Sequence, residues 1–515
     1  MKKTRLVSLV LSLMMTLLLI CPGSAAAQER PTLELFVNHT WWPLQNWNGS
    51  VPEYISNQLG VDIKVTVASD SQQLPLMIAG ETLPDLIYTD NTGNMITILS
   101  DADLCYDWES LTAQYTPDYQ FEESRAAINR AKDGKFYTIR NNYSTPDELE
   151  KYPAALVGVN VPTIRKSLYE ELGSPEIKTT EDFYQLLLKA KEAYPELIPC
   201  VFNTNWTGAG QTSCQFLTDF GCTYADFGLD EETDTVNYYI FQKGRLDYYK
   251  YMNKLYREGL MMAENYAFNN EDESYQYAYN LKCFAYIKGS NADELNQKCE
   301  ALGTDADWMD LNVALNYDTT WKSYDSNIGW SGLFVSKNCS NPEAATKLLT
   351  YLFSEEGMRT AFWGIEGTHW NWSVDGTYPV FCEEFTNKDW LKANGLTEWG
   401  LLSGTWACER LAKYQPNHPN ATDRLRLSNE AKAKTVSCPA VGLVIPEADS
   451  DEQAIKSKLD NMVKTEEMKI YLAESEEDCE AAYNAMLEQA RSMGADELNA
   501  WADATYKEAK LTMAK

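Results

Sequence analysis

Histidine is scarce in this sequence, and its few copies lie far apart. The three histidines are His39, His369 and His418, and no two of the 12 cysteines form a C-x-x-C pair. Zinc sites need clustered Cys and His ligands, and the calcium loop pattern D-x-[DN]-x-[DN]-G is also absent. We therefore predict no metal site and no cofactor, although a structural calcium of another kind stays open.

The spacing of the cysteines does not define a set of disulfide bonds. Cys214 with Cys222, or Cys283 with Cys299, could form local disulfides in an oxidising compartment, but spacing alone does not establish a bond. We expect mostly free, buried thiols.

Positive charge is also in short supply. The chain has 44 Lys and Arg against 75 Asp and Glu, a formal net charge of −31. A polyphosphate partner would need a basic surface, so we exclude nucleic acid as a partner. The net charge says little about a small ligand, because one pocket can differ from the average surface.

Long apolar runs are absent after the first 27 residues. Lys2, Lys3 and Arg5 precede the apolar run 6–20, which is the pattern of an export signal at 1–27. Cleavage after Ala25-x-Ala27 would release a secreted protein. Alternatively, 18–21 is similar to a lipobox and would anchor the protein through Cys21. We expect an exported, soluble chain that is extracellular, on the cell surface or periplasmic.

Strand and helix patterns alternate along the chain, with no repeat and no flexible linker. Alternation of this kind predicts α/β lobes with mostly parallel sheets, whose ligands sit at the carboxyl ends of the strands. The length predicts at least two lobes, built from interleaved segments. The first lobe is expected to begin with a strand at 33–37, a helix at 51–60, a strand at 61–67, a helix near 71–81 and a strand at 85–88.

Aromatic and amide side chains follow several of the expected strands. A sugar offers apolar C–H faces and hydroxyl edges, so a sugar site needs aromatic platforms beside hydrogen-bonding groups. The candidates that follow expected strands are Trp41, Trp42, Asp90, Asn91 and Trp206, and Trp330 is a candidate on the expected strand that crosses between the lobes. Four of them have a structural alternative: Trp41 and Trp42 could pack on their own lobe, and Asp90 and Asn91 could cap the next helix.

The stretch GIEGTHWNW, at 364–372, adds Trp370 and Trp372 to these candidates. If the stretch is extended, the two indoles point to the same side. They then form either a platform for a ligand or a wedge in the core.

Five stretches, taken in order, resemble the sugar-binding extracellular solute-binding proteins of ABC importers. They are IAGETLPDLIYTDN (78–91), YEELGSPEIKTTEDFYQLL, LYREGLM (255–261), NPEAATKLLTYLFSEEG and GIEGTHWNWSVDG. The resemblance implies a two-lobed, periplasmic-binding-protein-like fold of type II that closes on its ligand at a hinge. We expect lobe 1 at 28–155 plus 329–385, and lobe 2 at 156–328 plus 386–515.

The resemblance also implies a function. The chain would be a monomeric, non-enzymatic receptor that binds a carbohydrate, an oligosaccharide in particular, and delivers it to an ABC permease at the membrane. Two alternatives remain. A secreted glycoside hydrolase or lyase would need two carboxylates about 5 to 9.5 Å apart, and 75 acidic residues leave that possible. The other is a receptor of the same fold for a solute that is not a sugar, such as a peptide.

Overall fold

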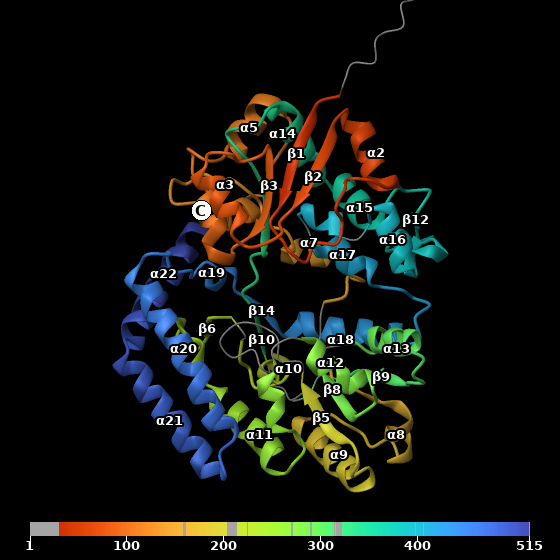
Figure 1. Cartoon of the computed structure of the whole chain (residues 1–515), viewed down its shortest axis with the longest axis vertical. Coiled ribbons are helices and arrows are strands. Elements are labelled where there is room, and N and C mark those ends of the chain that lie inside the picture. The colour runs from red at the N-terminus through yellow and green to blue at the C-terminus, as the bar shows by residue number, and fades with distance from the viewer. Residues whose placement is uncertain are drawn as a thin grey trace, which may run out of the picture.

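The chain folds into two lobes, which Figure 1 shows one above the other. The computed structural model describes residues 30–157, 161–202, 214–223, 225–268, 271–288, 291–313, 315, 322–396, 398–404 and 406–513. The expected export signal, with Cys21, and the candidate Trp206 lie outside these residues. No helix among the described residues has the length and apolar character needed to cross a membrane.

Lobe 1 is built on a four-stranded sheet in the order β11-β3-β1-β2. The first three strands along the chain are parallel, and β11 (Ser331–Val335) runs antiparallel to β3. The sequence prediction of strand, helix, strand, helix, strand is confirmed, with bounds β1 Thr32–Val37, α2 Ser50–Leu59, β2 Asp62–Val67, α3 Gln73–Ala79 and β3 Leu86–Asp90.

Helices cover both faces of this sheet because its strands are apolar on both sides. Leu33, Leu35 and Val37 face one cluster, to which α2, α5 (Trp108–Tyr115) and α14 (Pro342–Leu352) contribute. Phe36 faces the other, with α3 and α4 (Met95–Leu99). The rest of the lobe comprises η1 Thr92–Asn94, α6 Glu123–Ala127, α7 Pro146–Lys151, α15 Glu355–Trp363, β12 Trp370–Trp372, β13 Pro379–Phe381, η4 Glu383–Thr386, α16 Lys388–Asn394, η5 Glu398–Leu402 and α17 Trp406–Ala412.

Lobe 2 contains a second four-stranded sheet, in the order β5-β8-β4-β9. Only β5 and β8 are parallel, since β4 runs antiparallel to both of its neighbours, so this sheet is mixed where we expected a mostly parallel one. The strands are β4 Thr163–Arg165, β5 Ile198–Phe202, β8 Cys283–Ile287 and β9 Trp308–Asp310, with a separate hairpin of β6 Phe227–Asp230 and β7 Thr235–Tyr238.

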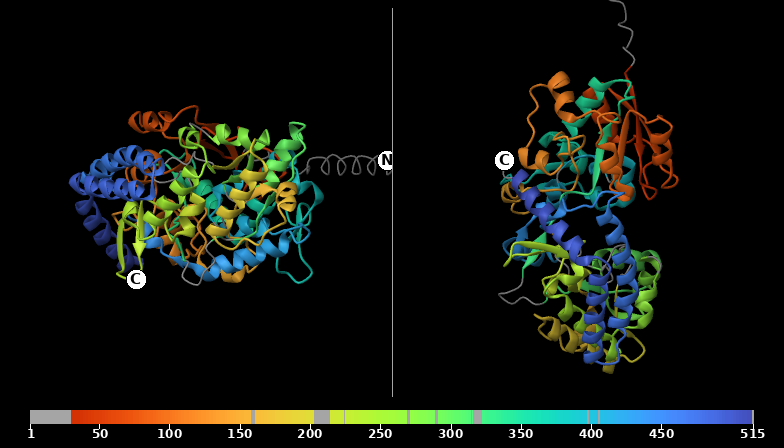
Figure 2. Two further views of the ribbon diagram at one scale, coloured as in Figure 1. Left: turned by 90° about the horizontal axis from the view of Figure 1, so that it is seen from below. Right: turned by 90° about the vertical axis from the view of Figure 1, so that its left-hand side faces the viewer.

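Helices surround the second sheet; two long C-terminal ones lie side by side along the outside of lobe 2, and the last helix slants from them toward lobe 1 (Figure 2). Helix α9 begins at Thr180, because the Thr179 hydroxyl accepts from the Asp182 backbone N–H in a capping box. The helices are α8 Lys166–Glu171, α9 Thr180–Ala193, α10 Cys214–Asp219, η2 Tyr239–Phe241, α11 Arg245–Arg257, η3 Ala263–Ala267, α12 Glu271–Tyr279, α13 Ala292–Ala301, α18 Ala421–Lys434, α19 Pro439–Gly442, α20 Asp451–Tyr471, α21 Glu476–Ser492 and α22 Ala495–Met513.

The chain passes between the lobes several times, and one expected boundary is wrong. Residues 386–412 belong to lobe 1, not lobe 2, because Trp399 and Leu402 pack in the same core as β1, and Leu411 packs with Trp363. Between the lobes, β10 (Ser323–Asp325) pairs in parallel with β14 (Thr435–Ser437) (Figure 1).

The cysteines agree with the expectation of free thiols. All cysteines whose side chains the structure describes are unbonded, and all of these except the partly buried Cys382 are buried.

Candidate functional site

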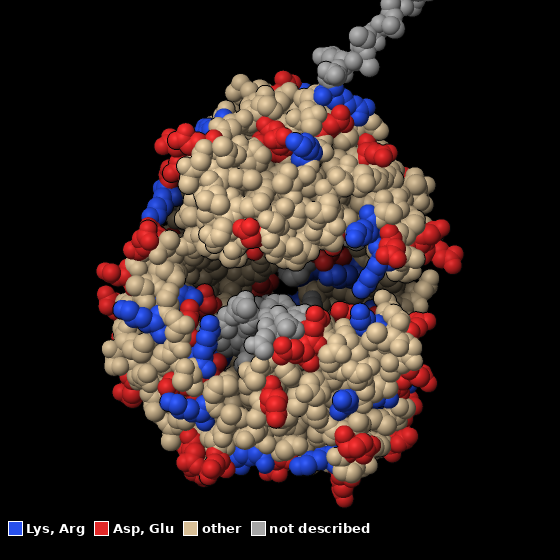
Figure 3. Space-filling model, viewed as in Figure 1, with Lys and Arg blue, Asp and Glu red and all other residues tan. Residues whose placement is uncertain are grey.

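A groove runs between the two lobes, and the space-filling view shows it as a hollow across the middle of the molecule (Figure 3). The carboxyl ends of β1 and β3 and the start of β11 meet at one edge of the lobe 1 sheet, where Ser331 lies opposite Asp90. Because β11 begins as the chain returns from lobe 2, this edge faces the groove. The segment 203–213, which follows β5 on the lobe 2 side, lies outside the described residues.

Five rings gather at this edge and form what we call the aromatic cluster: His39, Trp41, Trp42, Tyr88 and Trp330. Trp41 lies 5.4 Å from Trp42 and 6.1 Å from Trp330, measured between ring centroids. The planes of Trp41 and Trp330 are tilted by 36°. Thus Trp41 and Trp42, which follow β1, meet Trp330, which precedes β11 and lies almost 300 residues later in the chain.

Trp41 and Trp42 are neighbours in sequence, yet they differ completely in exposure. A turn closed by the hydrogen bond from Trp42 N–H to His39 O (3.0 Å) sends their side chains in different directions. Trp41 is 55% exposed, whereas Trp42 is 2% exposed and packs on Trp399. Only Trp41 of the two presents a free indole face, and Trp42 forms the layer beneath it.

Trp330 reaches the cluster because of the glycine before it. Gly329 has φ of +84°, and a Cβ there would lie 2.2 Å from the Asn141 carbonyl oxygen. Trp330 itself is partly buried and lies 5.2 Å from His39.

Asp90 and Asn91 end β3 at the same edge. One Asp90 oxygen accepts from the Thr92 backbone N–H (2.8 Å), while the other faces His39 Nδ1 at 3.8 Å. The carboxylate therefore does cap the next turn, as the structural alternative proposed, yet 30% of its side chain remains exposed to the groove edge. Asn91 makes no side-chain capping bond.

Trp370 and Trp372 point to the same side, but that side is covered. Their rings lie 4.8 Å and 5.5 Å from Trp363 of α15, and α17 closes the cluster. Trp370 is 2% exposed, and its Nε1–H donates to the Gly364 carbonyl (3.0 Å). The structure corrects the expectation for Trp370, because a buried indole with its N–H paired has no face for a ligand; the half-buried Trp372 packs beneath Arg359.

His369 explains the glycine at the start of this motif. Its Nδ1 accepts from the Ile365 backbone N–H (3.0 Å), and its Nε2 faces the Ser50 hydroxyl at 3.3 Å. A Cβ on Gly364, whose φ is +88°, would lie 2.2 Å from Nδ1. The turn therefore requires glycine and a histidine that is unprotonated at Nδ1.

His369 and His39 make the stability of the protein depend on pH. Burial lowers the pKa of His369, and it lowers the pKa of His39 against the opposing effect of Asp90. Below the ordinary histidine pKa of about 6.5, the unfolded chain therefore binds protons more readily than the folded protein does. The stability that the two neutral histidines contribute is complete above that pH and is lost as the pH falls. We expect urea midpoints to drop from pH about 7.5 to about 5.5, and His369→Asn to show a smaller drop. An equal drop in the variant would contradict this assignment.

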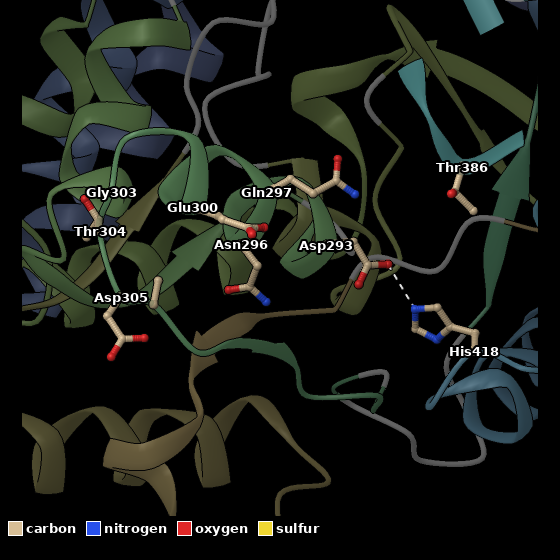
Figure 4. Close-up of a pocket in the computed structure, with 10 residues that line it drawn as sticks. Asp293, Asn296, Gln297, Glu300, Gly303, Thr304, Asp305, Thr386 and His418 are labelled. Carbon is tan, nitrogen blue, oxygen red and sulfur yellow. Dashed lines mark hydrogen bonds and ion pairs between the residues drawn. The ribbon is translucent and has the colours of Figure 1, made fainter. Parts of the chain in front are cut away.

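A second hollow, of about 870 Å³, lies between α13 and the lobe 1 residue Thr386 (Figure 4). Asp293 accepts there from Arg424 (2.6 Å) and faces His418 Nε2 at 3.1 Å; although burial opposes it, the Arg424 contact lowers the pKa of Asp293. Sequence analysis missed this hollow, because its parts come from separate segments with no motif. None of its described lining residues carries a phenyl or indole ring; they are Asp293, Asn296, Gln297, Glu300, Gly303, Thr304, Asp305, Ala306, Thr386 and His418.

Among the described residues, no group of three or more His, Cys, Asp and Glu could hold a metal ion.

Several solved structures have a fold similar to that of this chain. Among solved structures, the chain is similar to the S. pneumoniae ABC-transporter substrate-binding protein FusA in complex with kestose (TM-score 0.68, 17% identity, covering 93% of this chain and 99% of that one). It is also similar to an HMO-binding ABC-transporter-associated solute-binding protein from Bifidobacterium longum infantis (0.66, 15%, 93% and 98%) and to the N-glycan transport solute-binding protein NgtS from S. pneumoniae (0.60, 14%, 93% and 99%).

At these identities the likeness shows the fold, and no curated protein matches the sequence. The family model described as bacterial extracellular solute-binding protein, however, matches residues 43–359, more than half of the chain. The two lobes, the groove between them and this match confirm the resemblance seen in the motifs: the chain belongs to the bacterial extracellular solute-binding proteins.

Proposed function

We propose that the protein is the receptor of an ABC importer, which captures an oligosaccharide in the groove between its lobes and delivers it to a membrane permease. Family membership supports capture of a solute outside the cell. The names of the similar structures include kestose, HMO and N-glycan, which supports a carbohydrate ligand. On this account the protein acts as an exported monomer, free or anchored at Cys21, and binds without catalysing a reaction.

The exposed indole of Trp41 carries this proposal. It lies at the groove edge with the partly exposed Trp330 beside it and the Asp90 carboxylate one strand away. Apolar rings beside a carboxylate and an amide match the C–H faces and hydroxyl edges of a sugar. The Asp90 carboxylate then accepts from hydroxyls and the Asn91 amide accepts from or donates to them, and Trp206, outside the described residues, remains a candidate.

The geometry of the two indoles favours a ligand that lies on them. A sugar ring between two stacking planes needs a gap of about 7 to 8 Å, at about 3.5 to 4 Å per contact. Trp41 and Trp330 are 6.1 Å apart and tilted by 36°, so they cannot sandwich a ring. They present two adjacent facets instead, which suits consecutive sugar units of an oligosaccharide better than one monosaccharide.

Titration calorimetry against a ligand panel tests this function. The panel contains neutral oligosaccharides, their monosaccharides and short peptides. We expect saturable binding to at least one oligosaccharide, weaker binding of its monosaccharide and none of the peptides. A reducing-end assay on the same oligosaccharide should show no cleavage. Binding to peptides alone, or release of new reducing ends, would contradict the proposal in favour of the peptide receptor or the hydrolase.

A further inference from the structure

His39 joins the two chain segments that carry the exposed tryptophans. Its Nε2 lies 3.1 Å from the Ser331 hydroxyl, a contact between residues 292 positions apart. His39 precedes Trp41 by two residues, and Ser331 directly follows Trp330. The contact therefore fixes the loop after β1 to the start of β11, next to the groove.

The His39 ring also lies under both tryptophans. Its centroid is 5.2 Å from Trp41 and 5.2 Å from Trp330, and it stacks on Trp42 at 6.0 Å with a 19° angle between planes. Tyr88 meets the ring edge at 5.2 Å. Because His39 is 3% exposed, it reaches a ligand only through the residues that cover it.

We propose that His39 is the positioning residue of the ligand platform: bonded to Ser331 and packed beneath Trp41 and Trp330, its imidazole holds the two indoles at their mutual tilt. This inference rests on the proposed function, since the platform is the one proposed to bind the oligosaccharide. It adds a residue that makes no ligand contact of its own.

The charged surroundings of His39 decide its protonation. Among the described residues packed against it, Asp90 on β3 is the charged group, at 3.8 Å from Nδ1; Tyr88 on β3 can also titrate, but burial raises its pKa and keeps the phenol neutral. Ser331, Trp330, Trp41 and Trp42 do not titrate. Asp90 favours the tautomer with the proton on Nδ1, so that Nε2 accepts from the Ser331 hydroxyl.

Protonation would change this arrangement. A second proton on Nε2 removes the acceptor that Ser331 uses, so the hydroxyl has to turn and accept from Nε2–H, while the new charge is attracted to Asp90. Because burial lowers the pKa of His39, the neutral form prevails at neutral pH, and the cation forms only as pH falls below the ordinary histidine range. Ligand affinity should therefore fall at acid pH through His39.

The test compares three variants in oligosaccharide titrations at several pH values. At neutral pH, His39→Ala should weaken binding about tenfold, equivalent to a loss of about 1.4 kcal/mol. His39→Gln, which can still bond Ser331, should bind more tightly than His39→Ala but lose the acid-dependent fall in affinity. His418→Gln, at the second hollow, is the control and should keep both the affinity and the pH profile of the wild type.

A second readout needs no ligand. Acidification should change the tryptophan fluorescence of the wild type and of His418→Gln, and the change should be smaller in His39→Gln, which keeps only the contribution of His369 beside Trp390. Urea midpoints at neutral pH establish that each variant is folded. If His39→Gln keeps both the wild-type pH profile and the wild-type fluorescence transition, the positioning role is overturned. A wild type that binds no oligosaccharide refutes the proposed function instead, and the fluorescence titration then decides this inference alone.

Discussion

Replacing Trp41 and Trp330 together by alanine should lower oligosaccharide affinity by about a hundredfold. A sugar ring covers about 60 Å² of an indole face, which at about 25 cal/mol per Å² amounts to about 1.5 kcal/mol for each ring. Each such loss is about a tenfold change in the dissociation constant. Calorimetric titration of both single variants and of the double variant measures the loss of affinity.

The two losses need not add, because the rings touch each other. Trp41 and Trp330 are 6.1 Å apart, and contacting residues commonly show coupling. Val374→Ala is the control, since Val374 is fully exposed on the β12–β13 hairpin, outside the proposed platform. The double variant should keep its circular dichroism and unfold cooperatively. An affinity within twofold of the wild type would contradict the placement of the ligand.

Glu467→Ala is expected to destabilise the protein by about 3 to 5 kcal/mol, the usual cost of leaving a buried partner charge unpaired. Glu467 on α20 bonds Arg245 of α11 at 3.0 Å and also accepts from Tyr249. The Arg245 side chain is fully buried, with its guanidinium carbon within 5.3 Å of three tyrosine rings, those of Tyr239, Tyr248 and Tyr249. Urea unfolding at neutral pH measures the loss.

An ion pair on the surface serves as the control that separates the effect of burial from the effect of losing a charge. Glu343 and Lys347 form an i,i+4 pair on the surface of α14, at 2.7 Å. Glu343→Ala should cost less than about 1 kcal/mol, because water already solvates both groups. Equal losses in the two variants would show that burial of Arg245 adds nothing to the effect. Because Glu467 is buried and bonds residues of α11, not the aromatic cluster, the variant should keep its ligand affinity under conditions where it remains folded.

Local patterns predicted much of lobe 1. Apolar runs with period 2, separated by helical patterns, placed β1, α2, β2, α3 and β3 within about two residues, because these elements bury faces that their own sequence defines. The start of α9 was equally visible, since a capping box uses residues only three positions apart. The boundary at 385 was misplaced because the segment beyond it packs through scattered residues, such as Trp399, that follow no strand or helix period.

The sequence predicted only part of the candidate site, because part of it depends on contacts between distant segments. The carboxyl ends of the parallel strands β1 and β3 bring Trp41 and Asp90 to one edge, and Trp330 reaches the same edge because it precedes β11, which is antiparallel to β3. The sequence could not separate Trp41 from Trp42, because the turn closed at His39 decides which of them faces outward. Nor could it show that α15 and α17 cover Trp370, since α17 is contributed by a segment more than 30 residues later.

A crystal structure of the protein with an oligosaccharide selected from the panel tests the placement of the site most directly. We predict that the lobes close on the sugar and that consecutive units lie on the free faces of Trp41 and Trp330, with a hydroxyl within hydrogen-bond distance of Asp90 or Asn91. A sugar seated elsewhere, for example in the hollow beside Asp293, with both indoles left bare, would contradict the account.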